Sequence, residues 1–471
     1  MAERFAVVGR PILHSRSPAL FRRAFLDAAP GEPARSTYVR LAAASADEAL
    51  AVARELGLRG LNVTSPFKET MAARMDDLDD EARATAAVNT VLIGHRLQGH
   101  NTDPRGVEGA FAERGASLLR STVAVFGTGG AARAATLGAM RAGAARVVLI
   151  SRQAERARQV AERLEPAAAR IATDRGRGAS EPRHPSDRLI AGSAVAETAD
   201  VMRRSNVVIS CLPRGVELVD PTWLRPDHTV MDANYGASRL ESAARALGCR
   251  TVPGESWLLH QAAESFERFT GASAPVAAMT AALGSTQSGG RADRSNIALT
   301  GFMGAGKSTV GAELARRSTM SFVDTDRACE LQAGATIDQL FAQPGGEERF
   351  RRLERAELRR IETARSTVFA CGGGALLDAG IRKTVSDNAV IVWLWAPLDA
   401  CLSRLEGQSR PLLHGLGRKG TAALLQRRLP SYAESADLVI SVAARTATEV
   451  ATELAHEFRA VSEDPRHTDN G

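Results

Sequence analysis

The sequence has few aromatic residues, which make up 4% of its 471 positions, and only five cysteines. The cysteines form no CxxC pair and show no metal-ligand spacing, so they predict reduced thiols rather than a disulfide scaffold. The longest apolar run, residues 389–397, is far shorter than the roughly 20 residues that cross a bilayer. The first residues, MAERFAVVGRPILHS, lack the apolar core of a signal peptide. We therefore expect a cytoplasmic protein without a membrane partner.

An excess of one charge is also missing, because 60 Lys and Arg residues stand against 54 Asp and Glu residues, for a net charge of +6. No block of Lys and Arg with interleaved aromatic residues occurs, so the sequence predicts no nucleic-acid partner. A mild basic excess suits small anionic ligands. Small-molecule substrates are therefore the expected partners.

A chain of this length exceeds one ordinary core and predicts about three structural units. Strand-like runs alternate with Ala-, Arg- and Leu-rich helical stretches on both sides of a small, polar segment at residues 285–295. This alternation predicts α/β folds with parallel sheets, joined by a flexible linker. Residues 165–190 form a second polar stretch, which is expected to be a loop.

Residues 301–309, GFMGAGKST, lie between an apolar strand-like run and a helix-like segment. That order predicts a P-loop, in which glycines let backbone N–H groups turn toward phosphates. Lys307 would reach the terminal phosphates, and Ser308 would offer its hydroxyl to Mg²⁺. The expected ATP-binding residues of this loop are Gly304, Ala305, Gly306, Lys307, Ser308 and Thr309.

A second glycine-rich turn occurs in residues 121–132, STVAVFGTGGAA. It separates a strand-like run from a helix start, where a dinucleotide pyrophosphate can approach the backbone. The next strand-like run ends in Ser151 and Arg152 rather than in the Asp or Glu that binds a free ribose 2′-hydroxyl. An arginine there suits a 2′-phosphate and favours NADP, although a solvated surface arginine is the alternative interpretation. The expected cofactor residues are Gly127, Gly129, Gly130, Ala131, Ser151 and Arg152.

Five polar or glycine-rich motifs occur in order in the first 284 residues. They are PILHSRSP at 11–18, NVTSPFKE at 62–69, AVNT at 87–90, NTD at 101–103 and GTGGAARA at 127–134. In composition and order this set closely resembles the shikimate dehydrogenase family. The resemblance implies an α/β substrate domain, a Rossmann-type NADP domain, and reduction of 3-dehydroshikimate to shikimate.

By this resemblance Lys68 and Asp103 form the catalytic pair. A ketone oxygen gains negative charge as hydride arrives, so a cationic donor must be held there. The implied substrate-binding residues are Ser15, Ser17, Thr64, Lys68, Asn89, Asp103, Tyr235 and Gln261, and the cofactor side adds Gly254. The sequence departs from the family near the nicotinamide, with SCLPRGV at 210–216, DANYG at 232–236, Pro104 and Trp257.

Further motifs accompany the P-loop. They are VDTD at 323–326, EERFR at 347–351, GGG at 372–374, RPLL at 410–413 and RLPSY at 428–432. Together with the P-loop they resemble shikimate kinase over residues 296–458, which implies a second α/β enzyme with a parallel sheet.

The kinase resemblance assigns a role to each motif. Asp326 would hydrogen-bond the attacking 3-hydroxyl, and Arg351 and Arg428 would bind the shikimate carboxylate. Ser308 and Asp324 would hold Mg²⁺. The implied shikimate-binding residues are Asp326, Arg351, Gly372, Gly373, Gly374 and Arg428, and the nucleotide side adds Arg404 and Arg410.

We therefore expect a bifunctional enzyme of the shikimate pathway, which supplies chorismate for aromatic amino acids, using NADP(H), ATP and Mg²⁺. Two alternatives stay open, namely quinate as the dehydrogenase substrate and a non-catalytic role for one half. The expected domains are a dehydrogenase substrate domain at 1–101 and 245–284, an NADP domain at 102–244, a linker at 285–295, a kinase domain at 296–458 and a disordered tail at 459–471.

Overall fold

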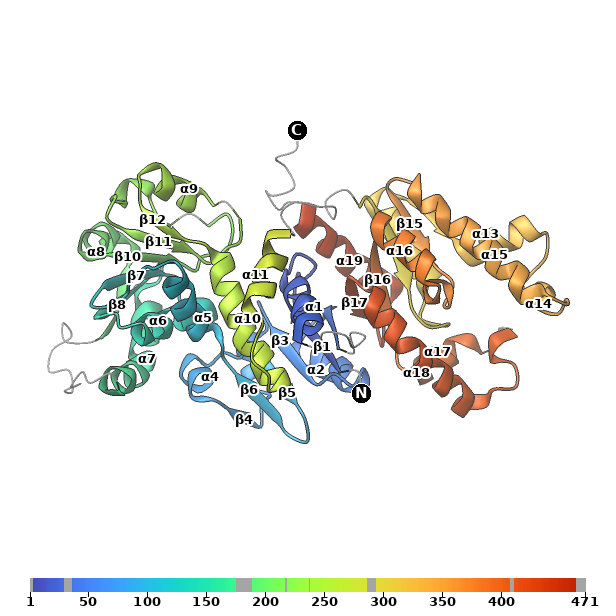
Figure 1. The fold of residues 1–471 in the computed structure, drawn as a ribbon, viewed down its shortest axis with the longest axis horizontal. Coiled ribbons are helices and arrows are strands. Elements are labelled where there is room, and N and C mark those ends of the chain that lie inside the picture. Colours follow the sequence, from blue (N-terminus) through green and yellow to red (C-terminus); the bar gives the residue numbers. More distant parts are fainter. Residues whose placement is uncertain are drawn as a thin grey trace. The chain divides into compact units, whose positions relative to one another are not determined.

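The structure is a computed structural model that describes residues 3–28, 36–174, 189–216, 218–236, 238–285, 294–406 and 411–462. Its internal contacts divide the chain into two compact units, and Figure 1 labels many of their elements. The first unit comprises Met1–Pro18, Arg35–Leu58 and Ser285–Gly471, and the second comprises Ala19–Ala34 and Arg59–Gly284. The first two strands of the chain thus belong to the same unit as the P-loop region. The domain boundaries expected from the sequence stay a prediction.

A parallel sheet of seven strands forms the centre of the first unit, in the order β14-β15-β13-β16-β17-β2-β1. Ala298 lies opposite Phe369 on one side and opposite Ile391 on the other, while Ile440 lies opposite Ala42. The strands are β1 (Arg4–Gly9), β2 (Thr37–Ala42), β13 (Asn296–Thr300), β14 (Ser321–Asp324), β15 (Thr367–Ala370), β16 (Ala389–Trp395) and β17 (Leu438–Ser441).

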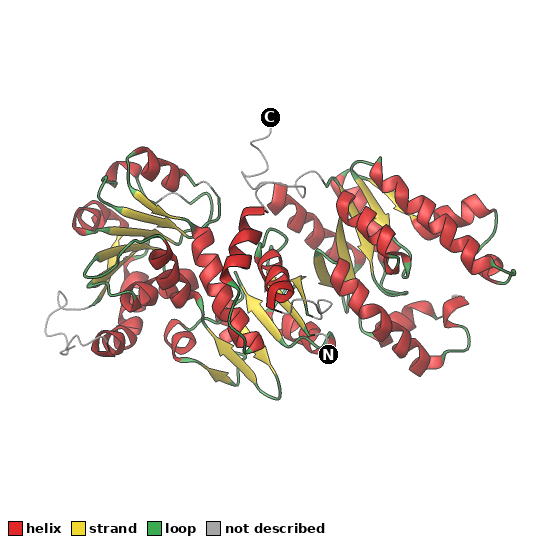
Figure 2. Cartoon of the chain, viewed as in Figure 1, coloured by secondary structure: helices red, strands yellow, loops and turns green. Residues whose placement is uncertain are grey.

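Helices cover both faces of this sheet (Figure 2), which explains why β16 is an uninterrupted apolar run, AVIVWLW. The helices are α2 (Ala46–Glu55), α12 (Lys307–Ser318), α13 (Thr325–Ala333), α14 (Ile337–Phe341), α15 (Gly346–Arg359), α16 (Ala379–Asn388), α17 (Leu398–Leu405), α18 (Gly417–Ser435) and α19 (Ala447–Ser462), with 3₁₀ turns η4 (Arg360–Glu362), η5 (Ala375–Leu377) and η6 (Pro411–Leu413). The strand order reverses at β13, so the loop after β13 lies at the crevice where α/β sheets bind ligands.

The second unit contains a parallel sheet of six strands in the order β12-β11-β10-β7-β8-β9. Its order reverses at β7, the strand that precedes the second glycine-rich turn, as in a dinucleotide-binding fold. Buried apolar clusters lie on both of its faces. The strands are β7 (Thr122–Phe126), β8 (Arg146–Ser151), β9 (Ile190–Ala194), β10 (Val207–Ser210), β11 (Thr229–Asp232) and β12 (Arg250–Val252).

Four further strands of the second unit follow the order β3-β5-β6-β4, and β5 runs antiparallel to both of its neighbours. They are β3 (Gly60–Val63), β4 (Asp77–Leu78), β5 (Thr90–Ile93) and β6 (Leu97–His100). The remaining elements are α3 (Lys68–Ala72), α4 (Asp80–Thr85), α5 (Asp103–Glu113), α6 (Gly130–Arg141), α7 (Ala154–Asp174), η2 (Val195–Glu197), α8 (Thr198–Arg204), η3 (Pro221–Trp223), α9 (Arg239–Ala246), α10 (Gly254–Thr270) and α11 (Val276–Ser285). Helix α1 (Ser17–Ala28) begins in the first unit and continues in the second.

The predicted α/β fold class with parallel sheets is confirmed, but the expected loop at 165–190 is wrong over its first part. Helix α7 continues through Pro166 to Asp174, because Ala167 and Ala168 are buried in the sheet core and Ala172 is buried one turn later. At the other end of that segment Ile190 begins β9, and residues 175–188 lie outside the described residues. So do 286–293 of the predicted linker and 463–471 of the predicted tail. In the described part of the chain, no helix has the length and apolar character needed to cross a membrane.

Candidate active sites

The loop between β13 and α12 forms a cradle of backbone groups. Gly301 and Gly304 have φ values of 142° and 78°, which L side chains rarely adopt. A Cβ on Gly304 would lie 2.4 Å from the Cys401 carbonyl oxygen, so a side chain has no room there. Lys307 begins α12, and its Nζ donates to the carbonyl oxygens of Gly301 and Phe302 at 3.0 and 3.1 Å. A helix N-terminus with a lysine beside it suits a polyphosphate.

A pocket of about 410 Å³ opens beside this loop. Asp324 caps α13 by accepting a hydrogen bond from the Arg327 backbone N–H at 3.1 Å, which fixes its carboxylate at the end of β14. Ser308 and Asp324 offer oxygen donors, and Mg²⁺ typically takes one or two carboxylates together with substrate phosphates. The donor set therefore fits Mg²⁺ bound with a nucleotide. The lining residues are Met303, Gly304, Gly306, Lys307, Ser308, Thr309, Asp324, Asp326, Ala370, Cys371, Gly373, Arg404 and Leu405.

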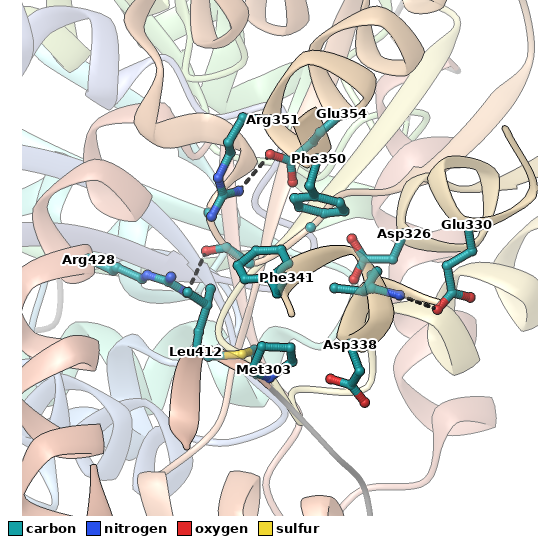
Figure 3. A pocket seen from close by; sticks show the side chains of 15 residues that line it. Met303, Asp326, Glu330, Asp338, Phe341, Phe350, Arg351, Glu354, Leu412 and Arg428 are labelled. Carbon is teal, nitrogen blue, oxygen red and sulfur yellow. Dashed lines mark hydrogen bonds and ion pairs between the residues drawn. The ribbon is translucent and has the colours of Figure 1, made fainter. Parts of the chain in front are cut away.

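Two arginines line a second, smaller pocket of about 110 Å³ (Figure 3). Arg351 donates from Nη1 to Glu354 Oε2 at 2.7 Å, and Arg428 donates from Nη1 to the Gly373 carbonyl oxygen at 3.1 Å. Arg428 is 5% exposed, and its Nε has no hydrogen-bond partner among the described residues. Two guanidinium groups at one small cavity suit a planar carboxylate.

Asp326 lines both pockets, together with Met303 and Gly373. A carboxylate at this junction can accept a hydrogen bond from a hydroxyl of the bound acid while that hydroxyl faces a phosphate. Burial raises the pKa of the neighbouring Glu354. It also raises the pKa of Cys371 to about 12, so this thiol stays protonated at neutral pH.

In the second unit, Lys68 and Asp103 form an ion pair between Nζ and Oδ2. Each is the first residue of a helix, α3 and α5 respectively. Asn89 donates from Nδ2 to Asp103 Oδ1 at 2.9 Å, and the Trp257 indole donates to the Asp103 carbonyl oxygen at 3.0 Å. The carboxylate is buried and held from two sides, while the lysine side chain keeps 19% of its surface exposed. This arrangement presents a charged amine that can give a proton to a ligand.

A network of amides and hydroxyls surrounds that pair. Asn89 is 2% exposed, and its Nδ2 also donates to Gln261 Oε1 at 3.3 Å. Its Oδ1 accepts from the Thr102 backbone N–H at 2.9 Å, and the Thr102 hydroxyl donates to the Gln261 carbonyl oxygen at 3.0 Å. The predicted residues Asn89, Asp103 and Gln261 therefore come together from separate elements.

The glycine-rich turn after β7 lies beside the same lysine. Gly127 has a φ of 117°, and a Cβ on it would lie 3.3 Å from the Cys211 carbonyl oxygen. Helix α6 begins at Gly130, where a Cβ would lie 3.7 Å from Lys68 Cδ. A tight backbone turn at a helix N-terminus fits a pyrophosphate and would bring a dinucleotide next to Lys68.

The other predicted cofactor-side residues follow strand ends. Arg152 is exposed directly after β8, and the Ser151 hydroxyl accepts from the Gln153 backbone N–H at 3.3 Å. Gly254 begins α10, and a Cβ on it would lie 2.6 Å from the Asn234 carbonyl oxygen. Glycine at position 254 thus allows the start of α10 to lie close to the backbone at Asn234.

Of the remaining predicted substrate residues, Thr64 and Tyr235 belong to the second unit, and Ser15 and Ser17 belong to the first. Thr64 directly follows β3, and the Tyr235 carbonyl oxygen accepts from Arg214 Nη2 at 2.7 Å. Ser15 and Ser17 lie in the first unit, 8% and 6% exposed, with their hydroxyl oxygens 3.4 Å apart.

Three family models match the chain. They are "Shikimate dehydrogenase substrate binding domain" over residues 7–91, "Shikimate 5′-dehydrogenase C-terminal domain" over 258–283 and "Shikimate kinase" over 303–459. A shikimate dehydrogenase (NADP(+)) of Symbiobacterium thermophilum is 36% identical over 288 residues, which are 59% of this chain and 92% of that protein. A shikimate kinase of Moorella thermoacetica is 42% identical over 166 residues, which are 35% of this chain and 95% of that protein. The chain belongs to both families.

Solved structures resemble the dehydrogenase half. A shikimate dehydrogenase in complex with NADP⁺ has a TM-score of 0.51 and 26% identity, covering 60% of this chain and 96% of that one. A quinate dehydrogenase from Corynebacterium glutamicum in complex with NAD has the same TM-score and identity, covering 60% and 99%. The fold alone therefore does not distinguish shikimate from quinate as the substrate of the dehydrogenase half.

Membership of the two families confirms the predicted pairing of an oxidoreductase with a kinase, while the roles of single residues stay predictions. Arg410 of the kinase half lies outside the described residues. Arg404 lines the larger pocket and donates to the carbonyl oxygens of Gly304 and Val442 at 3.4 and 2.8 Å.

Three residues in contact with these sites were given no binding or catalytic role by the sequence analysis. Glu354 binds Arg351, the Tyr432 hydroxyl donates to the Gly373 carbonyl oxygen at 2.5 Å, and Trp257 binds the Asp103 backbone. Glu354 follows Arg351 by three positions on α15, a spacing that places both on one helical face and could have revealed it.

Proposed function

We propose that the dehydrogenase half reduces 3-dehydroshikimate to shikimate with NADPH and that the kinase half then phosphorylates shikimate with ATP. One observation carries this proposal. A dehydrogenase with a Lys–Asp pair and a kinase with an Asp at its pocket junction occur in one chain, so the product of one family's reaction is the substrate of the other.

In the dehydrogenase half, bound NADPH supplies the hydride. Lys68 donates a proton to the ketone oxygen as negative charge develops there, and Asp103 keeps the ammonium charged and oriented. Asn89 holds the Asp103 carboxylate at 2.9 Å, which limits its movement during turnover. Hydroxyl and amide groups of Ser15, Ser17, Thr64 and Gln261 are proposed to bind the ring hydroxyls and carboxylate of the substrate.

In the kinase half, Arg351 and Arg428 bind the shikimate carboxylate in the smaller pocket. Asp326 accepts the proton of the 3-hydroxyl and aims that oxygen at the phosphate cradle. Lys307 neutralises charge on the transferring group, and Mg²⁺ held by Ser308 and Asp324 supplies further neutralisation when bound.

Quinate with NAD is the second candidate for the dehydrogenase half, because a quinate dehydrogenase shares the fold. Arg152 favours NADP, since an arginine after the second strand suits a 2′-phosphate. The proposal therefore assigns shikimate and NADP to this chain.

A coupled assay of the full chain tests the proposal. With 3-dehydroshikimate, NADPH and Mg-ATP, we expect loss of NADPH and appearance of shikimate 3-phosphate, and without ATP we expect shikimate to accumulate. No NADPH consumption would refute the dehydrogenase assignment, and no phosphorylation of added shikimate would refute the kinase assignment. Faster oxidation of quinate with NAD⁺ than of shikimate with NADP⁺ would favour the second candidate.

A further inference from the structure

The segment that carries Ser15 and Ser17 is held by side chains from the far end of the chain. Glu457 of α19 accepts hydrogen bonds on Oε2 from the backbone N–H groups of Ile12 and Leu13, at 2.7 and 2.8 Å. Glu457 is fully buried, so these amides have no access to water through that face. Leaving such donors without an acceptor is costly, and Glu457 therefore determines where this segment lies.

A second carboxylate of α19 holds the start of the segment. Glu453 accepts from Arg10 Nε and Nη2 at 2.7 and 2.6 Å, a two-bond arrangement that fixes orientation as well as distance. Glu453 is 3% exposed, and Arg445 lies 3.9 Å from the same carboxylate.

A buried arginine holds the other end of the segment. Arg40 of β2 donates from Nε and Nη2 to the Ser15 carbonyl oxygen at 2.9 and 2.6 Å. Its Nη1 donates to the Asp437 carbonyl oxygen at 3.1 Å, directly before β17. Strand β2 pairs in parallel with β17, so Arg40 is anchored by the kinase half (β17 and α19 are labelled in Figure 1).

These contacts act on the backbone just before the paired hydroxyls, at residues 12 and 13, and at Ser15 itself. We propose that Glu457, supported by Glu453 and Arg40, positions Ser15 and Ser17 for substrate, so that side chains of the kinase half hold a segment of the dehydrogenase half within one compact unit. Glu457 is a positioning residue, because it acts through the segment and not on the substrate. The inference rests on the proposed role of the two serines in binding shikimate.

Three full-length variants test this inference. Glu457→Leu removes the acceptor, Glu457→Gln keeps a carbonyl oxygen in the same place, and His456→Gln changes an exposed neighbour on α19 as the control. We expect Glu457→Leu to raise the dehydrogenase KM for shikimate by about tenfold or more, since one buried and one part-buried backbone donor lose their acceptor. Glu457→Gln and the control should stay within about threefold of the wild type, because the acceptor remains.

The other kinetic constants separate positioning from general damage. The KM for NADP⁺ and the kinase kcat/KM should stay within about twofold in Glu457→Leu, since those sites lie elsewhere. An unchanged KM for shikimate, or an equal effect of Gln and Leu, would overturn the inference.

A milder variant covers the case in which Glu457→Leu does not fold. Glu453→Gln leaves both amides bonded to Glu457 and weakens only the Arg10 contact, so a rise in the shikimate KM of roughly two- to fivefold is expected. No rise would overturn the inference. A wild-type chain that does not oxidise shikimate would instead refute the proposed function. Failure of the proposed function is therefore distinguishable from failure of the positioning role of Glu457.

Discussion

At the residue scale, both proposed reactions depend on charged side chains whose partners the fold holds in place. Lys68 contacts Asp103, and Arg351 contacts Glu354. Each of these ion pairs fixes the direction in which the charged group of the lysine or arginine points. The sequence motifs identified the first three residues, but Glu354 lies on a helix rich in Arg and Glu, where such residues usually face solvent.

Lys68→Ala is expected to lower dehydrogenase turnover by roughly 10²- to 10⁴-fold, because the proton donor to the developing oxyanion is lost. Steady-state assays of NADPH consumption measure the effect. Kinase activity of the same preparation on added shikimate serves as the internal control and should be unchanged. Ketone reduction close to the wild-type rate would show that another group donates the proton.

Arg152→Ala is expected to reduce the preference for NADPH over NADH by roughly tenfold or more, because a charge-assisted contact with the 2′-phosphate is lost. The ratio of kcat/KM for the two cofactors measures this. The adjacent exposed residue provides the control Gln153→Ala, which should keep the wild-type ratio. Equal kcat/KM values of the wild type for NADPH and NADH would contradict the assignment of NADP.

Glu354→Gln is expected to raise the kinase KM for shikimate by roughly five- to fiftyfold, because Arg351 loses its charged partner at 2.7 Å and its orientation. The KM for ATP should change little, since Glu354 lines only the smaller of the two kinase pockets. An equal rise in both constants would indicate general disruption of the pocket.

At the scale of elements, the proposed sites gather at strand ends and helix starts. Lys68, Asp103, Gly130 and Lys307 are each the first residue of a helix, where backbone N–H groups point outward. Local motifs predicted these positions well, because a strand, a tight turn and a helix start are short-range features. Helix α19 is different, since its buried face carries carboxylates that no motif identified.

The pH dependence of the free energy of unfolding should reveal the titration of Glu457, a buried carboxyl group of α19. Burial and the nearby Glu453 raise the pKa of Glu457 to about 7, against the opposing effects of the Ile12 and Leu13 amides and of Arg40 on β2. Because the folded-state pKa lies above the ordinary 4.5, this group's contribution to stability is complete below about pH 4.5 and is lost as the pH rises through 7.

Glu457→Gln removes this titration and keeps a neutral acceptor. Relative to the variant, the wild type is therefore expected to lose about 2–3 kcal/mol of unfolding free energy between pH 5 and pH 8. Urea unfolding of both proteins at several pH values measures the difference. Parallel pH profiles for the two proteins would contradict the raised pKa of Glu457.

At the scale of the whole molecule, two enzyme families share one chain, and strands β1 and β2 belong to the same compact unit as the kinase elements. Strand β17 of the kinase half therefore supplies hydrogen-bonding partners to β2, near the start of the dehydrogenase half. Covalent linkage also ensures that the two enzymes are made in equal amounts. This benefit does not depend on direct transfer of shikimate from one active site to the other.

Shikimate made by the chain is expected to exchange freely with solution, because a tether raises the effective concentration only of groups that remain attached to it. Adding isotopically labelled shikimate during coupled turnover tests this expectation. Labelled and newly made shikimate should enter the phosphorylated product in proportion to their concentrations. Persistent exclusion of the added label would demonstrate direct transfer.

The sequence by itself determined the chemistry of both halves. A phosphate cradle, a dinucleotide turn and a Lys–Asp pair each need particular residue types at short spacings, so the motifs were sufficient to predict two enzymes of the α/β class. Only the tertiary structure decided that β2 pairs with β17 and that Glu457 holds the segment before Ser15. The reason is that each of these contacts involves backbone groups of the segment that is held. Nearly every residue offers such groups, so the side chains of that segment carry no signature of the contact.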